Sequence, residues 1–508
     1  MAKGRHSLLA KAVLMHRGIA YLGGLGLLLF CLSGLCHIAM MWTGPQAAAF
    51  FPPQATIDPT LVARIPATLE RARISIAQVV KVVPTENGPL LQVTENHALP
   101  RRYFNLTSGE ELLHYDQRQA VWLARYYSGK KEVPVRSITF QAEFSNDYPW
   151  VNRLLPVYRI EFETPEHLTL FIDTELGALA DITDSKKVFL QVLFRWGHTW
   201  SFLEDVEVGR LLMIFVLLVA IIGMALSGLS MISLMKRRRM PWYRTVHRSV
   251  GLFIWLPILA LSASGLVHLF ASSPVYTTQS RQQALQLPSA MLLSPDRFAW
   301  DVSELNWLAG EKTPAVSLME GPDGELFIRI ATTSGDQSKR VDRSARFKGV
   351  PRESSAIFVS ASTGQVSNMT DQEIATHHAT RHLGESAKGV FPARLITQFG
   401  PEYDFRNKRL PAWAIDFEAE KKGTIFIDPA SGMQIDRVSF DEKVERYSFS
   451  FLHKWNFLPP FVGRAGRDVL LALVILASVF GTGLGFYLRF ASPKKTAKIC
   501  EGRGFSRE

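Results

Sequence analysis

The stretch His16–His37, HRGIAYLGGLGLLLFCLSGLCH, returns later in the chain as His247–His268, HRSVGLFIWLPILALSASGLVH. Both copies open with His-Arg and close with Ser-Gly-Leu-x-His, and 21 residues separate the two histidines in each copy. As a helix, this separation is roughly 31 Å, about the thickness of a bilayer's hydrocarbon core. The repeat therefore predicts two membrane-spanning helices, each with one histidine near either face.

The two histidines of each copy also share one side of the predicted helix. An advance of 21 residues is about five full turns plus 300°, so the two side chains project within about 60° of each other. Polar groups inside a membrane span usually face the helix bundle and are usually functional. One face of each helix can therefore serve both histidines.

Two more apolar stretches, Leu211–Met235 and Val469–Phe490, are long enough to cross a membrane. Residues 1–17 and 236–248 carry four and six basic residues and no acidic residue. The positive-inside rule then places both termini and this loop in the cytoplasm of a bacterial inner-membrane protein, and explains the basic pI without nucleic-acid binding. The predicted segments are a cytoplasmic N-terminus (1–18), a span (19–42), an outer region (43–205), a span (206–235), a basic loop (236–248), a span (249–271), an outer region (272–466), a span (467–490) and a cytoplasmic tail (491–508).

The outer regions repeat as well, because residues 158–203 match residues 413–458 without a gap. A strand followed by a turn glycine appears four times, ending at Gly109, Gly177, Gly364 and Gly432. We therefore expect two small α+β units in each outer region. Segments 70–83 and 371–382 are predicted to be helices of these units.

With these motifs, nearly the whole chain resembles the PepSY-associated transmembrane family. The resemblance rests on the His-Arg and Ser-Gly-Leu-x-His ends of the first and third spans, the strand-Asp-x-x-x-Gly turns, and the His-x-Trp-x-Phe-Leu motif before the second and fourth spans. It implies a four-helix transmembrane bundle built from a tandem repeat, with two extracytoplasmic α+β PepSY-like regions. Members include iron-regulated membrane proteins and reductases of siderophore-bound iron that hold b-type haems between their helices.

Paired histidines on different helices are the ligands that a b-type haem requires. Covalent haem is not expected, because the chain has no Cys-x-x-Cys-His motif. His16 with His247 can hold a haem near the cytoplasmic side. Four further histidines allow one or two outer sites, and the sequence does not choose among their pairings; these are His37, His198, His268 and His453.

Several neighbouring residues allow two interpretations. Arg17 and Arg248 can pair with haem propionates, but they also fit the pattern of positive-inside anchors. The glycines of the first two spans can give a flat ring access to the backbone, or serve helix packing; they are Gly23, Gly24, Gly26, Gly223 and Gly228.

A second histidine cluster lies in the outer region at His377, His378 and His382. If 371–382 is helical, His378 and His382 lie on one side and can form a metal pair. The sequence places no third ligand near them. A solvated helix face is therefore the favoured interpretation.

The leading functional hypothesis is transmembrane electron transfer through two or more b-type haems. The cytoplasmic segments are too short for a dinucleotide-binding domain, so a quinol or a separate cytoplasmic flavoprotein would supply electrons. By resemblance, the periplasmic acceptor would be ferric iron or a ferric siderophore, which releases its metal on reduction. The alternative is a non-enzymatic binding or regulatory protein that modulates envelope proteases.

Overall fold

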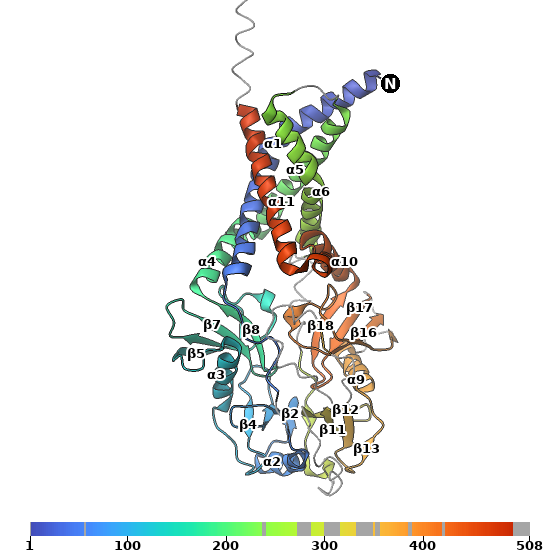
Figure 1. The fold of residues 1–508 in the computed structure, drawn as a ribbon. Coiled ribbons are helices and arrows are strands. Elements are labelled where there is room, and N and C mark those ends of the chain that lie inside the picture. The colour runs from blue at the N-terminus through green and yellow to red at the C-terminus, as the bar shows by residue number, and fades with distance from the viewer. Residues whose placement is uncertain are drawn as a thin grey trace, which may run out of the picture. The chain divides into compact units, whose positions relative to one another are not determined.

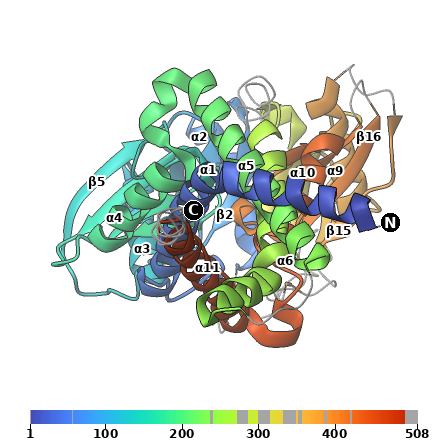
Figure 2. The same cartoon turned by 90° about the horizontal axis from the view of Figure 1, so that it is seen from above.

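Four long helices are apolar enough to cross a membrane, and their number matches the four predicted spans. They are α1 (Ala2–Thr43), α5 (Glu207–Leu234), α6 (Trp242–Ala271) and α11 (Pro459–Phe490). Helix α1 packs on α5 and α11, and α6 packs on the same two helices, so the four form a closed bundle (Figures 1 and 2).

The computed structural model describes most of the chain. The described residues are 2–54, 57–235, 240–271, 286–298, 315–331, 349–350, 356–384, 389–418 and 422–490. The predicted tail and residues 236–239 of the predicted basic loop lie outside this part. By contacts the chain forms two units: the membrane helices with their flanking segments, and an outer unit of residues 45–185 and 278–443.

The glycines of the first span lie where helices approach closely. A Cβ atom on Gly23 would lie 3.0 Å from the backbone oxygen of Ala220, and one on Gly24 would lie 2.8 Å from the ring of Phe486. Gly26 packs in the same way on α5. These contacts support the helix-packing interpretation of the glycines.

Short helices precede the second and fourth membrane helices in the same order. Helix α4 (Ser185–Phe194) runs into a π-helix, η3 (Arg195–Thr199), and helix α10 (Phe440–Ser448) runs into a π-helix, η9 (Phe449–His453). A 3₁₀ segment, η4 (Ser201–Val206), then leads into α5. Because π-helical turns often occur at functional sites, the repeated pair is informative.

In the outer unit, strands from both outer regions form one seven-stranded antiparallel sheet, in the order β13-β12-β11-β10-β2-β3-β4. The first region supplies β2 (Val79–Val83), β3 (Leu90–Thr94) and β4 (Arg102–Phe104). The second supplies β10 (Val316–Glu320), β11 (Leu326–Ala331), β12 (Ala356–Ser360) and β13 (Val366–Ser367). The two outer regions therefore share this sheet.

The predicted helix over residues 70–83 is wrong. Helix α2 (Ile65–Arg71) ends early, and strands β1 (Ile76–Ala77) and β2 follow. Four of the five residues of β2 are buried, and its valines favour an extended backbone once both sides of the strand are covered. By contrast, the helix predicted over 371–382 is confirmed as α9 (Asp371–Leu383), which starts with a capping box at Thr370.

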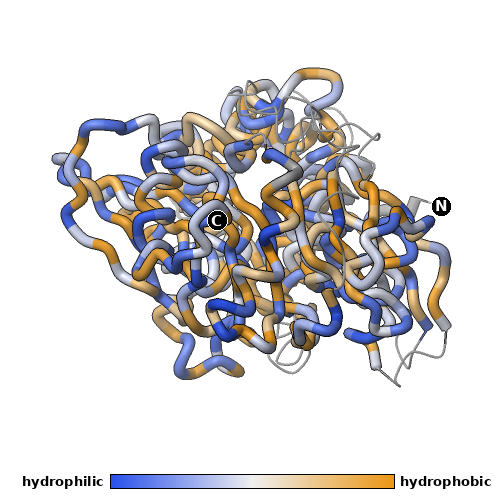
Figure 3. Tube along the Cα trace, turned by 90° about the horizontal axis from the view of Figure 1, so that it is seen from below, coloured by the Kyte–Doolittle hydropathy of each residue, from blue (hydrophilic) through white to orange (hydrophobic). Residues whose placement is uncertain are grey.

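Each outer region also has a smaller antiparallel sheet of its own. The first contains β5 (Val135–Gln141), β6 (Val157–Phe162), β7 (Thr169–Asp173) and β8 (Ala178–Thr183), and α3 (Tyr115–Ser128) packs on it. The second contains β14 (Gly389–Val390), β15 (Arg394–Ile396), β16 (Ala412–Glu418), β17 (Gly423–Ile427) and β18 (Gln434–Ser439), and α9 packs on it. Hydrophobic and hydrophilic stretches are interspersed along the trace (Figure 3).

Short elements complete the outer unit. Strand β9 (Met291–Leu292) pairs with β1. The four predicted turn glycines all have a left-handed backbone, with φ between 62° and 72°, which confirms these turns. The described 3₁₀ segments of the outer unit are η1 (Pro59–Arg64), η2 (Trp150–Asn152), η5 (Pro295–Arg297) and η8 (Phe405–Asn407).

A buried ion pair joins the seven-stranded sheet to the first small sheet. Lys81 on β2 lies 2.6 Å from a carboxylate oxygen of Glu175, in the turn between β7 and β8, and both side chains are at most 10% exposed. Burial alone would raise the pKa of Glu175, but the charges of Lys81 and Arg101 lower it to about 2. Burial also lowers the pKa of Lys81, against the opposing effect of Glu175.

Candidate functional site

The two inner histidines are held in equivalent ways by neighbouring helices. The Nδ1 atom of His16 on α1 lies 3.1 Å from the backbone oxygen of Met224 on α5. The Nδ1 atom of His247 on α6 lies 3.1 Å from the backbone oxygen of Gly481 on α11. A carbonyl can only accept, so both Nδ1 atoms donate, and each Nε2 atom keeps its lone pair for a ligand.

A glycine lies against each inner histidine ring, four residues after the accepting carbonyl. A Cβ atom on Gly228 would lie 3.4 Å from Cε1 of His16, and one on Gly485 would lie 3.1 Å from Cε1 of His247. The two inner histidines also lie within electrostatic range of each other. The two repeats thus surround His16 and His247 with the same contacts, a backbone carbonyl at Nδ1 and a glycine against the ring.

The serine of each Ser-Gly-Leu motif holds an outer histidine. His198 Nδ1 lies 3.0 Å from the Ser33 hydroxyl, and His453 Nδ1 lies 3.1 Å from the Ser264 hydroxyl. Each serine donates its one proton to a carbonyl of the preceding helical turn, Ser33 to Leu29 at 2.8 Å, so its oxygen accepts from the imidazole. These two histidines therefore also present Nε2 with a free lone pair.

The four outer histidines and two phenylalanines form a continuous row of rings. The π-helices contribute the middle of the row, where the centroids of His198 and His453 are 6.1 Å apart. On either side a phenylalanine stacks on the middle histidine and contacts the next one. The successive centroid distances are 5.0 Å for His37–Phe194, 4.9 Å for Phe194–His198, 4.7 Å for His453–Phe449 and 4.5 Å for Phe449–His268.

The two ends of this row differ in charge. His268 Nδ1 lies 2.5 Å from a carboxylate oxygen of Glu445 on α10. Around His37, three cations and one anion lie within electrostatic range, namely Lys187, Lys454, Arg467 and Asp468. The repeat is therefore symmetric in its rings and asymmetric in its charges.

The two arginines next to the inner histidines differ in exposure and in hydrogen bonding. Arg17 is exposed. Arg248 donates to the backbone oxygen of Ile232 at the end of α5, at 3.1 Å. The side chain of Arg17 is thus available to a bound anion. Arg248 instead caps a backbone oxygen in the last turn of α5.

The outer histidine cluster does not form a solvated helix face, contrary to the favoured interpretation. His378 is 4% exposed, and His382 Nε2 lies 3.0 Å from the backbone oxygen of Gly432. Among the described residues no group of three potential ligands could hold a metal ion. These two histidines instead pack α9 against the turn between β17 and β18.

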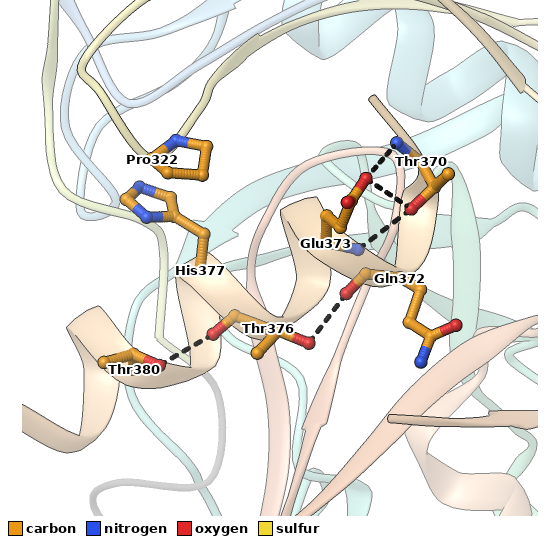
Figure 4. Close-up of a pocket in the computed structure, with 7 residues that line it drawn as sticks. All are labelled: Pro322, Thr370, Gln372, Glu373, Thr376, His377 and Thr380. Atoms are coloured by element: carbon orange, nitrogen blue, oxygen red, sulfur yellow. Dashed lines mark hydrogen bonds between the residues drawn. The ribbon is translucent and has the colours of Figure 1, made fainter. Parts of the chain in front are cut away.

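His377 points the other way, toward Pro322, in an open hollow of about 560 Å³ along α9 (Figure 4). The hollow is lined mainly by one face of the helix. Thr370 and Glu373, which also line it, hydrogen-bond to each other in the capping box. These two polar side chains are therefore already engaged in the cap of the helix.

Sequence reasoning found the six histidines but missed their supporting residues. Phe194 and Phe449 each precede an outer histidine by four residues, so the repeat itself carried the signal for them. The serines lay inside a recognised motif without an assigned role. Glu445 has no acidic counterpart in the first repeat, so no repeat signal marked it.

No family model matches the chain, and no curated protein is significantly similar to it.

Proposed function

We propose that the membrane unit binds two or more b-type haems and serves as a transmembrane electron-transfer protein that reduces ferric iron or a ferric siderophore on the periplasmic side. The observation that carries the proposal is the set of histidines whose Nδ1 atoms are held by carbonyl, hydroxyl or carboxylate oxygens. Metal-ligating histidines almost always have such a partner on the second nitrogen, which fixes the ring and its tautomer. Five of the six candidate histidines meet this requirement, namely His16, His198, His247, His268 and His453.

The positions of these side chains along the helices suit a path across the membrane. His16 and His247 would hold an inner haem, and the four histidines of the ring row would hold the outer ones. When bound, haem supplies a one-electron carrier. The helices supply apolar walls that exclude water, and Arg17 remains a candidate partner for a propionate.

Electrons would enter from a quinol in the membrane or from a separate cytoplasmic flavoprotein. On the outer side, reduction of ferric to ferrous iron weakens its binding by hard oxygen ligands and releases the metal. The PepSY-like outer unit would then bind the acceptor.

The proposal is tested by the haem content of the purified protein. We expect b-type bands in the reduced-minus-oxidised spectrum and at least two haems per chain by pyridine haemochrome. His16→Ala and His247→Ala should each remove one haem, whereas His167→Ala, at an exposed site in the outer unit, should remove none. Full haem content in both inner variants would contradict the inner pair.

A colourless wild-type protein would contradict the proposal as a whole and favour the alternative of a binding or regulatory protein. The acceptor is tested separately by mixing the reduced protein with a ferric siderophore under anaerobic conditions in the presence of a ferrous chelator. We expect oxidation of the b-type bands together with formation of the coloured ferrous chelate. Reduced bands that persist would exclude this acceptor.

A further inference from the structure

Among the hydrogen bonds of the described residues, only that of Glu445 joins a carboxylate to one of the six candidate histidines. Its Oε1 atom lies 2.5 Å from Nδ1 of His268, and its side chain is 15% exposed. The other anchored candidates contact uncharged carbonyl or hydroxyl oxygens. A hydrogen bond to a carboxylate is shorter and stronger than one to a neutral acceptor.

The first repeat offers an internal comparison. Phe449 and His453 correspond to Phe194 and His198, so Glu445 corresponds to Leu190 on α4. The fold around the two positions is repeated, but the charge is not. The carboxylate is therefore a feature of the second repeat alone and is not needed to build the helix pair.

We infer that Glu445 is a positioning residue that lowers the reduction potential of the haem ligated by His268; this inference rests on the proposed function. By accepting the Nδ1 proton it leaves Nε2 as the coordinating atom and makes the imidazole a stronger electron donor. A stronger donor stabilises ferric over ferrous iron. The outer end of the path thereby becomes a stronger reductant, which suits an acceptor whose oxygen ligands favour ferric iron.

Redox titration of the purified, haem-loaded full chain tests this role. Glu445→Gln keeps an oxygen acceptor and removes the charge, so the midpoint potential of one haem should rise while the others stay unchanged. Asp441→Asn makes the same charge change on the same helix at an exposed position, and should shift no midpoint. Glu445→Leu, which copies the first repeat, should also weaken haem binding at this site about 10- to 100-fold.

Unchanged midpoints in Glu445→Gln, with full haem content, would overturn the inference and leave the proposed function standing. A colourless wild-type protein would instead overturn both. If Glu445→Gln fails to retain haem, Leu190→Glu decides the question, because it leaves His268 and its partner intact. This variant should lower one midpoint potential, and an unchanged titration would overturn the inference.

Discussion

Acid pH should loosen helix α9 through His378. The side chain is 4% exposed and packs so closely on the neighbouring turn that a Cβ atom on Gly432 would lie 2.7 Å from its ring. Burial, together with the nearby charges of His377, His382 and Arg381, lowers the pKa of His378 from 6.5 to about 3. The folded protein therefore holds this imidazole in its neutral form.

The sign of the pH effect follows from this difference. Because the folded pKa lies below the unfolded one, the unfolded state binds the proton first as the pH falls. The stability contributed by neutral His378 is fully present above pH 6.5 and is lost progressively between pH 6.5 and about 3. At pH 5 the loss is about 2 kcal/mol, or about thirtyfold in the opening equilibrium of α9.

Hydrogen exchange of the full chain in detergent measures this opening, at pH 7 and pH 5 after correction for intrinsic exchange rates. We expect α9 amides to lose about thirtyfold in protection in the wild type, and far less in His378→Gln. His377 and His382 also have pKa values lowered by burial, so a smaller dependence should remain. His167→Gln, which removes an exposed histidine, should behave as the wild type does. Equal losses in His378→Gln and the wild type would refute the assignment.

Two further substitutions test the packing of the outer unit. Gly432→Ala should destabilise it by about 2–5 kcal/mol, because strain at φ 70° adds to a clash with the ring of His378, whereas Gly177→Ala at the equivalent turn meets only ordinary contacts and should cost about 1–2 kcal/mol. Equal shifts in the thermal unfolding midpoint would contradict this. Glu175→Gln should cost about 3–5 kcal/mol because it leaves the charge of Lys81 buried without its carboxylate, and an unchanged midpoint would show that the pair is not important for stability.

The membrane helices were predictable because the signal for them is long and redundant. A span needs about 20 apolar residues, and each predicted span meets this requirement within a helix that the structure describes. The turn glycines were predictable for a different reason. Only a residue without a Cβ atom adopts a left-handed backbone without cost, so a glycine after a strand is a strong local signal.

The outer strands were harder to predict because their burial depends on a partner about 235 residues away. In β2 every residue but Val83 is buried, so the alternation that marks a half-exposed strand is missing. Its partner β10 comes from the other outer region. A local pattern cannot reveal that both sides of a strand will be covered by distant parts of the chain.

Within the candidate site, the histidines could be recognised because each occurs in both repeats. Glu445 could not be recognised in this way. Residues that occur twice at equal spacing stand out in one sequence, as do Ser33 and Ser264. A residue that breaks the symmetry has no copy to draw attention to it. Its contact with His268 becomes apparent only when α10 and α6 are brought together in space.

Strands β2 and β10 pair with each other at the centre of the seven-stranded sheet. Lys81 lies opposite Ser317, and Val80 lies opposite Leu318, so one strand from each outer region meets the other in antiparallel register. If one repeat stood alone, β2 would expose a row of unpaired backbone groups, which is unfavourable and prone to aggregation. In the full chain, antiparallel pairing with β10 of the second repeat gives these backbone groups their hydrogen-bond partners. In the outer unit, each repeat therefore supplies one of the two central strands, β2 and β10. In the membrane unit, each repeat likewise supplies half of the row of histidine and phenylalanine rings.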